Sequence, residues 1–284
     1  MPVERTTTGR LTVRKTYKLF IGGAFPRSES GRTYVVQDTN VPLASRKDVR
    51  DAVVAARAAV PKWAGATAYN RGQILYRIAE MLEGRRAQFV DEVSAGGENA
   101  STVDAAIDRW VWYAGWADKI AQVYGGANPV AGPYFNLSSP EQTGVVGIVA
   151  PPDSALLGLV SVLAPAIVGG NAVVVLAAEE RPLPAISLAE VLATSDLPGG
   201  VVNVLTGRVA ETGPWLASHM DVNAIDLSGV DDPQLATELE AAAAENLKRV
   251  LRPAPGPVDW TAEPGIERMT ALLETKTVWH PKGV

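Results

Sequence analysis

Three short apolar segments decide the fold: VVGIVA at 145–150, AVVVLA at 172–177 and VVNVL at 201–205. Apolar runs of this length are typical of strands that are buried on both faces of a sheet. Helical patterns separate them, and strands that alternate with helices form a parallel sheet covered on both sides. Because crossover connections are right-handed, the sequence predicts a doubly wound α/β domain. Its ligand crevice is expected at the carboxyl ends of the strands.

Further elements extend this alternation in both directions along the chain. Ser45 is expected to cap a helix whose apolar face includes Val49 and Val53, and the next apolar stripe includes Ile78. The remaining predicted elements are small hairpin strands within 18–36, helices near 100–124, 183–194, 211–218 and 233–245, and strands near 222–227 and 247–251.

The segment 252–264, RPAPGPVDWTAEP, breaks the pattern, since four of its thirteen residues are proline. This composition indicates a linker or a chain crossing and not a folded element. The tail beyond it predicts one short helix and a terminal strand at Thr275–His280. At the other end, residues 1–17 are expected to form a flexible arm, without the apolar stretch of a secretory signal.

Composition excludes several classes of function. The 26 Lys and Arg against 31 Asp and Glu give a net charge of −5, which disfavours nucleic-acid binding. The chain has no cysteine, so thiol chemistry, disulfides and cysteine-based zinc sites are excluded, and its two histidines predict no metal site. The uncharged run 154–178 is interrupted by Gly169-Gly170, which leaves a helix of ~22 Å, too short for a membrane core of ~30 Å. We therefore expect a soluble cytoplasmic protein.

The residues alone show no catalytic apparatus. Neither a P-loop lysine motif nor a GxGxxG fingerprint is present. Asp153 follows the first buried strand, where it either caps the next helix or faces the crevice. Glu179 follows the second strand at the equivalent height, where it is either an exposed loop charge or an acceptor for ribose hydroxyls.

Several longer stretches nevertheless resemble one family. They are LFIGGAF (19–25), RGQILYRIAEMLEGRR (71–86), TGVVGIVAP (143–151), LAPAIVGGNAVVV (163–175), DLPGGVVNVLTG (196–207) and TKTVWHP (275–281). Together they are similar to the aldehyde dehydrogenase superfamily, over nearly the whole chain from Lys18 onward. The resemblance implies the NAD-binding domain of that family.

The same resemblance implies that the catalytic groups are lost. NLKRVL (246–251) resembles the segment before the family's general-base glutamate, but Pro253 stands where that glutamate is expected. The thiol-bearing catalytic domain would follow there, and the linker replaces it. At Asp153 the family carries an asparagine whose amide donates to the oxyanion; a carboxylate in its place removes a donor worth about 3 kcal/mol. We expect a truncated, non-catalytic member.

The positions that would bind NAD are altered as well. Glu179 survives at the family's ribose-binding carboxylate, but Leu176 replaces a lysine that contacts the ribose. Gly229 survives at the start of the helix beneath the pyrophosphate, followed by Val230 instead of a serine. Asp231-Asp232 then place carboxylates at the helix start, as ordinary capping residues, where a phosphate would otherwise lie. We therefore interpret Glu179 and Gly229 as remnants of a cofactor-binding site. We expect no bound cofactor; binding of NAD is the alternative.

The resemblance also assigns the assembly elements. YFNLSSPEQTGVV (134–146) resembles the oligomerisation hairpin, and Thr275–His280 its C-terminal strand, which pairs with other chains or closes the chain's own sheet. The predicted domains are a Rossmann-like domain (18–133 and 144–251), a small oligomerisation β-sheet (134–143 and 265–284) and the linker (252–264). The leading hypothesis is a pseudoenzyme subunit that scaffolds or regulates a full-length aldehyde dehydrogenase, or else forms a homo-oligomer. The alternatives are a module that binds NAD or adenosine nucleotides, and a residual NAD(P)-dependent aldehyde dehydrogenase.

Overall fold

A parallel sheet forms the centre of the molecule in the computed structural model, which describes residues 13 and 15–283. The strand order is β7-β6-β5-β8-β9, with every neighbouring pair parallel. The strands are β5 (Val145–Val149), β6 (Ala172–Leu176), β7 (Val202–Leu205), β8 (Ala224–Asp226) and β9 (Arg249–Leu251). The chain runs outward from β5 through β6 and β7, then returns to the other side of β5. This is the predicted doubly wound α/β fold.

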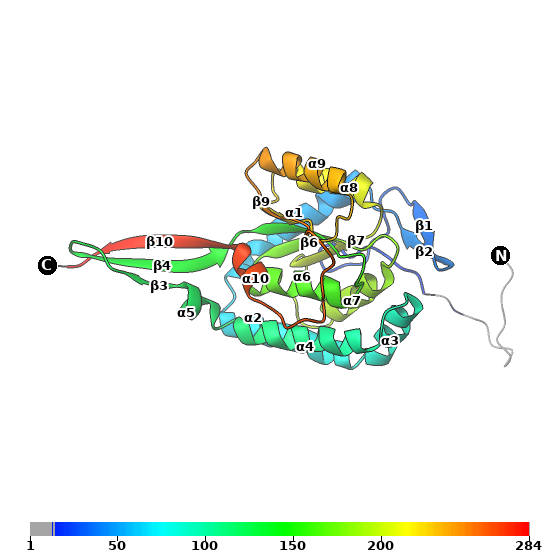
Figure 1. The fold of residues 1–284 in the computed structure, drawn as a ribbon, viewed down its shortest axis with the longest axis horizontal. Coiled ribbons are helices and arrows are strands. Elements are labelled where there is room, and N and C mark those ends of the chain that lie inside the picture. Colours follow the sequence, from blue (N-terminus) through cyan, green and yellow to red (C-terminus); the bar gives the residue numbers. More distant parts are fainter. Residues whose placement is uncertain (1–12, 14, 284) are drawn as a thin grey trace.

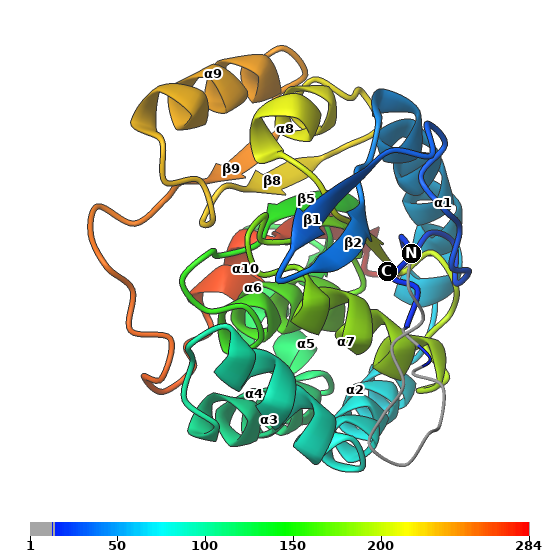
Figure 2. The ribbon, with the colours of Figure 1, turned by 90° about the vertical axis from the view of Figure 1, so that its right-hand side faces the viewer.

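Helices cover both faces of the sheet (Figures 1 and 2). On one face lie α1 (Arg46–Ala64), α8 (Val209–Ala217) and α9 (Pro233–Ala244). On the other lie α6 (Leu157–Val168) and α7 (Leu183–Ala193), which are covered in turn by α2 (Ala68–Glu83), α3 (Arg86–Ala95) and α4 (Ser101–Trp116). All residues of β5, β6 and α6 are buried, because each element has neighbours on every side.

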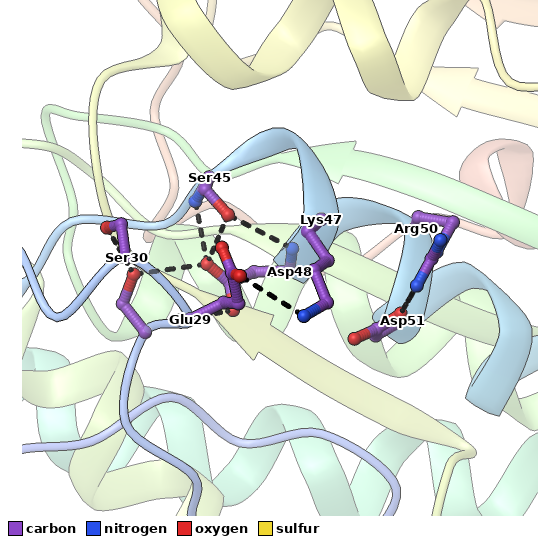
Figure 3. A network of polar contacts seen from close by, with 8 residues as sticks. Glu29, Ser30, Ser45, Lys47, Asp48, Arg50 and Asp51 are labelled. Carbon is purple, nitrogen blue, oxygen red and sulfur yellow. Dashed lines mark hydrogen bonds and ion pairs between the residues drawn. The ribbon is translucent and has the colours of Figure 1, made fainter.

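The start of α1 shows how the sequence sets a helix boundary (Figure 3). Ser45 is the N-cap, as predicted, and its side chain accepts from the Asp48 backbone N–H, while the Asp48 carboxylate accepts from the Ser45 N–H at 2.7 Å. Asp48 also accepts from the Ser28 hydroxyl at 3.1 Å and the Glu29 N–H at 3.0 Å. This reciprocal capping box therefore also fastens the preceding segment to the helix.

Gly170 ends the long apolar run as predicted. It adopts φ +101° between α6 and β6, a conformation that a residue with a Cβ rarely adopts. Within the described residues, no helix combines the length and the apolar character that crossing a membrane requires.

Two local predictions differ from the structure. The helix expected over 100–124 is divided into α4 and α5 (Ile120–Tyr124), and this break turns Ile120 into the core. A tight reversal at Gly22-Gly23 is present as expected within 18–36, since Ile21 and Ala24 form an antiparallel bridge across it. The longer hairpin, β1 (Thr33–Val36) and β2 (Thr39–Pro42), extends beyond the expected range and reverses at Gln37 and Asp38, both at positive φ. The helix α3 was not anticipated at all.

A three-stranded antiparallel arm extends away from the body (Figure 1). It consists of β3 (Gly126–Asn128), β4 (Tyr134–Gln142) and β10 (Leu273–Pro281), in the order β10-β4-β3. Segments far apart in the sequence thus form one sheet, since all nine residues of β10 pair with β4. The hairpin's first strand, β3, lies upstream of the range 134–143 assigned from the sequence, and β10 begins two residues before Thr275. A short helix, α10 (Glu267–Ala271), precedes β10.

Of the predicted N-terminal arm, residues 1–12 and 14 lie outside the described residues. Lys15, which belongs to the part of the arm that the structure describes, contacts the body of the protein. Its Nζ lies 2.8 Å from the Glu190 carboxylate on α7.

Candidate functional site

The ligand crevice of this fold lies where the direction of strand succession reverses. Here that switch point falls between β5 and β8, since the chain proceeds from β5 to β6 on one side and reaches β8 on the other. A cavity of about 800 Å³ lies at this edge. Its lining includes Asp153, Val230, Asp231, Pro253, Val258 and Trp260. The chain after β9 therefore forms part of the crevice.

Trp260 is the buried centre of this region, with a side chain that is only 8% exposed. Its indole Nε1 donates to both carboxylate oxygens of Asp153, each at 3.1 Å. The sequence had offered helix capping as one role for Asp153. That role is wrong, because α6 begins four residues later at Leu157 and receives no side-chain cap from Asp153. Asp153 instead anchors the segment that follows β9.

Arg268 lies over the face of the Trp260 indole. Its guanidinium lies 5.4 Å from the centre of the Trp260 ring, within cation–π range. The same guanidinium pairs with Asp226 at 2.9 Å and donates to the Ser228 hydroxyl at 2.8 Å. Since Asp226 is the last residue of β8 and is 1% exposed, Arg268 joins α10 to the end of the sheet.

Two side chains of α4 hold the backbone of the same segment. The Arg109 guanidinium donates to the carbonyls of Trp260 and Ala262, both at 2.9 Å. The Tyr113 hydroxyl donates to the Gly265 carbonyl at 3.0 Å. Burial raises the pKa of Tyr113 to about 12 and lowers the pKa of Arg109. We call residues 258–265 the strap; it contains no helix or strand and lies in the irregular loop between β9 and α10 (Figure 2). Side chains that follow β5 or lie on α4 and α10 hold it at the switch point.

Carboxylates lie at two helix N-termini near this edge. The Glu98 carboxylate accepts from the Ala155 N–H at 2.8 Å, just before α6, and pairs with Arg181 at 3.3 Å. Asp232 is the N-cap of α9, as predicted, and accepts from the Gln234 N–H at 2.9 Å. Helix N-termini bind phosphates through such free N–H groups, so here protein carboxylates use groups that a phosphate would need.

Glu179 lies apart from the strap, after β6. Its side chain is 43% exposed, and its carboxylate lies 3.7 Å from Arg208, which also pairs with Glu211. Its backbone carbonyl accepts from the Tyr34 hydroxyl at 3.1 Å, and burial and the nearby Glu179 carboxylate raise the pKa of Tyr34. Glu179 is thus an exposed loop charge with a cation beside it.

Gly229 has a packing role in this structure. A Cβ built on it would lie 2.1 Å from the carbonyl oxygen of Ala150, and its N–H donates to Val149 at 3.1 Å. Only glycine allows the β8–α9 loop to approach β5 this closely. Pro253, the other altered position, lies half-buried on the cavity wall, and its neighbour Arg252 pairs with Glu240 on α9.

The site thus gathers Asp153 and Pro253, with Gly229 on the adjoining β8–α9 loop, but not Glu179, and it contains residues that sequence reasoning missed. Arg109 lies 151 residues before Trp260 in the chain, and these two residues form no local motif with Arg268. The one available signal was Trp260, which is the only aromatic residue in the proline-rich segment 252–264. No group of three or more His, Asp or Glu side chains in the described ranges is arranged to hold a metal ion.

Comparison with known proteins identifies relatives of this chain. A family model described as "Aldehyde dehydrogenase family" matches residues 36–256. "Aldehyde dehydrogenase, cytosolic 1" of Elephantulus edwardii is 34% identical over 249 residues, covering 82% of this chain and 49% of that protein. Human "Retinal dehydrogenase 2" is 35% identical over 259 residues, covering 86% and 49%. The chain therefore spans about half the length of the curated relatives it matches.

Solved structures agree with the sequence comparison. The NAD+ complex of an aldehyde dehydrogenase from Bacillus cereus superposes with a TM-score of 0.77 at 25% identity, covering 83% of this chain and 50% of that one. HpcC from Thermus thermophilus gives 0.78 at 29% identity, covering 83% and 47%. The similarity again extends over about half of each solved chain.

Proposed function

The chain belongs to the aldehyde dehydrogenase family, and from that premise we propose that it is a non-catalytic subunit that assembles with a full-length aldehyde dehydrogenase and scaffolds or regulates it. The observation that carries this proposal is the contact between Asp153 and Trp260. A position that the family resemblance assigns to the oxyanion donor here holds the chain's own strap, through hydrogen bonds of 3.1 Å.

The loss of chemistry is supported by the residue types present. No cysteine occurs in the 284 residues, so no thiolate is available to attack an aldehyde carbonyl. Asp153 accepts hydrogen bonds where an oxyanion would need a donor. Pro253, at the position of the family's general base, has no group that takes up a proton. We infer that the strap segment stands in place of the catalytic domain.

We also propose that this chain does not use NAD, although relatives include an NAD+ complex. Trp260 lies at the switch point, and the carboxylates of Glu98 and Asp232 accept from N–H groups at helix N-termini. Negative charge at these positions repels a pyrophosphate. Glu179 lies 3.7 Å from the Arg208 guanidinium in an exposed pair, apart from the strap. The cavity beside Trp260 is the observation that favours the competing proposal, a nucleotide-binding module.

The arm supports assembly as the remaining role. β10 pairs with β4 along one edge, and its other edge has no partner strand among the described residues. Such an edge accepts a strand from another chain. Phe135 and Leu137, 56% and 44% exposed, present apolar surface on one face of the arm, and Trp279, which pairs with Asn136, presents apolar surface on the other face. A partner chain that covers either face would remove apolar groups from water.

Co-expression with a full-length relative from the same source, followed by native mass spectrometry, tests the assembly. The expected result is a complex that contains both chains. Leu137→Lys should abolish it, because the charge would be buried in the interface, whereas Val35→Lys on β1 (67% exposed in the parent) should leave it intact. A lone monomer or a pure homo-oligomer in the presence of the full-length relative contradicts the proposal.

Activity and nucleotide binding are tested on the purified chain alone. We expect no NADH from aldehydes and no quenching of tryptophan fluorescence at millimolar NAD or ATP. NADH production that Asp153→Ala abolishes would establish a residual dehydrogenase instead. Saturable quenching without turnover would establish the nucleotide-binding module.

A further inference from the structure

Trp260 is bound in the manner of a ligand. The edge of its indole donates to a carboxylate, its face lies against a guanidinium, and its backbone carbonyl accepts from Arg109. We infer that the switch-point pocket is a binding site for a neutral, electron-rich aromatic ring with an N–H donor, and that Trp260 fills it as a tethered ligand. The strap is thus an autoinhibitory segment that closes the crevice from within the same chain. This inference does not depend on the proposed partner.

The groups around the indole define the chemistry of a competing ligand. Asp153 accepts hydrogen bonds, so the ring needs an N–H directed at it. Arg268 lies over the face of the ring, and a cation there attracts an electron-rich ring and repels a positively charged one. Asp231 lines the same cavity and adds negative charge, so carboxylates and phosphates are disfavoured. An uncharged indole or a similar fused N–H heterocycle fits all three conditions.

The strap can move out of the crevice as one segment. Trp260 is its only buried residue, while Asp259, Thr261 and Glu263 are exposed. No helix or strand has to unfold when the strap moves, since it has no regular hydrogen-bond ladder of its own. The neighbouring cavity of about 800 Å³ already lies open beside it. Because the chain joins the strap to β9 at one end and to α10 at the other, Trp260 competes as an intramolecular ligand, and free ligands bind the parent chain poorly.

Removing the tethered ring tests the inference. Trp260→Gly leaves a vacancy of the shape of indole, and indole itself is the probe. We expect millimolar indole to raise the Tm of the Trp260→Gly chain and to leave that of the parent unchanged. Trp215→Gly is the matched control, because Trp215 is 42% exposed on α8, stacks on Arg46 and lines a different cavity from Trp260. Indole should not stabilise that variant.

Second-site variants then test which side chain recognises the indole N–H. In the Trp260→Gly background, Asp153→Leu should weaken indole binding about tenfold or more, because a hydrogen bond to a charged group is lost. Asp231→Leu, at the same cavity but without a hydrogen bond to the strap, should leave the affinity unchanged. Indene, which has the same shape but no N–H, should bind as weakly as indole binds the Asp153→Leu variant. Equal effects of the two leucine substitutions, or no indole binding to a folded Trp260→Gly chain, overturn the inference.

A second measurement covers the case in which Trp260→Gly does not fold. Trp260→Phe keeps an aromatic ring and loses only the indole N–H and some volume. Hydrogen exchange of the strap amides should be at least about tenfold faster in Trp260→Phe than in Trp215→Phe, because strap opening then breaks one interaction fewer. Equal exchange rates would show that Asp153 does not hold the strap closed.

Discussion

Arg268→Met is the substitution from which we expect the largest loss of stability at the switch point. The Asp226 carboxylate is 1% exposed, and Arg268 is its ion-pair partner at 2.9 Å. Removal of the guanidinium leaves a buried negative charge that retains only its hydrogen bonds from the Ser228 backbone and hydroxyl. Breaking one side of a buried pair costs roughly 3–5 kcal/mol, since the remaining charge is uncompensated. Methionine preserves most of the volume, so packing contributes little to the loss.

Urea unfolding followed by tryptophan fluorescence measures this loss. With a slope of about 3 kcal/mol/M, a loss of 3–5 kcal/mol lowers the midpoint by about 1–2 M. Arg249→Met is the matched control: its bidentate pair with Glu274, at 2.9 and 2.8 Å, is exposed on both sides. Exposed pairs contribute only about 0.2–1 kcal/mol.

The double substitution Arg268→Met with Asp226→Asn separates charge from contact. If the cost is the buried charge, neutralising Asp226 should restore at least half of the stability that Arg268→Met removes. The reasoning is refuted if Arg268→Met loses no more free energy of unfolding than Arg249→Met. It is also refuted if Asp226→Asn restores nothing.

Three further predictions follow from local geometry. Gly229→Ala should lower the free energy of unfolding by roughly 1–3 kcal/mol, because its Cβ would overlap the Ala150 carbonyl; Gly256→Ala, with no atom within 4 Å of the new Cβ, should change thermal stability little. The pKa of Tyr113 is raised from 10.0 to about 12, so its contribution to stability is complete below pH 10 and is lost as the pH rises towards 12. Tyr113→Phe should therefore flatten the alkaline fall of the unfolding free energy, and an unchanged pH profile would contradict this. Ser45→Ala should cost about 0.5–2 kcal/mol in urea unfolding through loss of the α1 cap, and a cost near zero would show that Asp48 alone suffices.

Local patterns in the sequence determined the doubly wound sheet. The three apolar segments became β5, β6 and β7, and the capping residues Ser45 and Asp232 became helix N-caps, because burial and capping depend on residues close together in the chain. The family followed from the same stretches. Errors occurred where a turn or a break has no strong local signal, as at the division of the predicted helix 100–124.

Only the tertiary structure decided what the switch point contains. Asp153 lies more than 100 residues before Trp260 and Arg268 in the chain. None of the three carries a local pattern that predicts its contact with the others. Their contact depends on where the proline-rich segment crosses the sheet edge, and proline composition limits local conformation without specifying a path. The sequence alone shows that none of the 284 residues is a cysteine. The chain's own tryptophan lies in the crevice because of long-range packing, which depends on the tertiary structure.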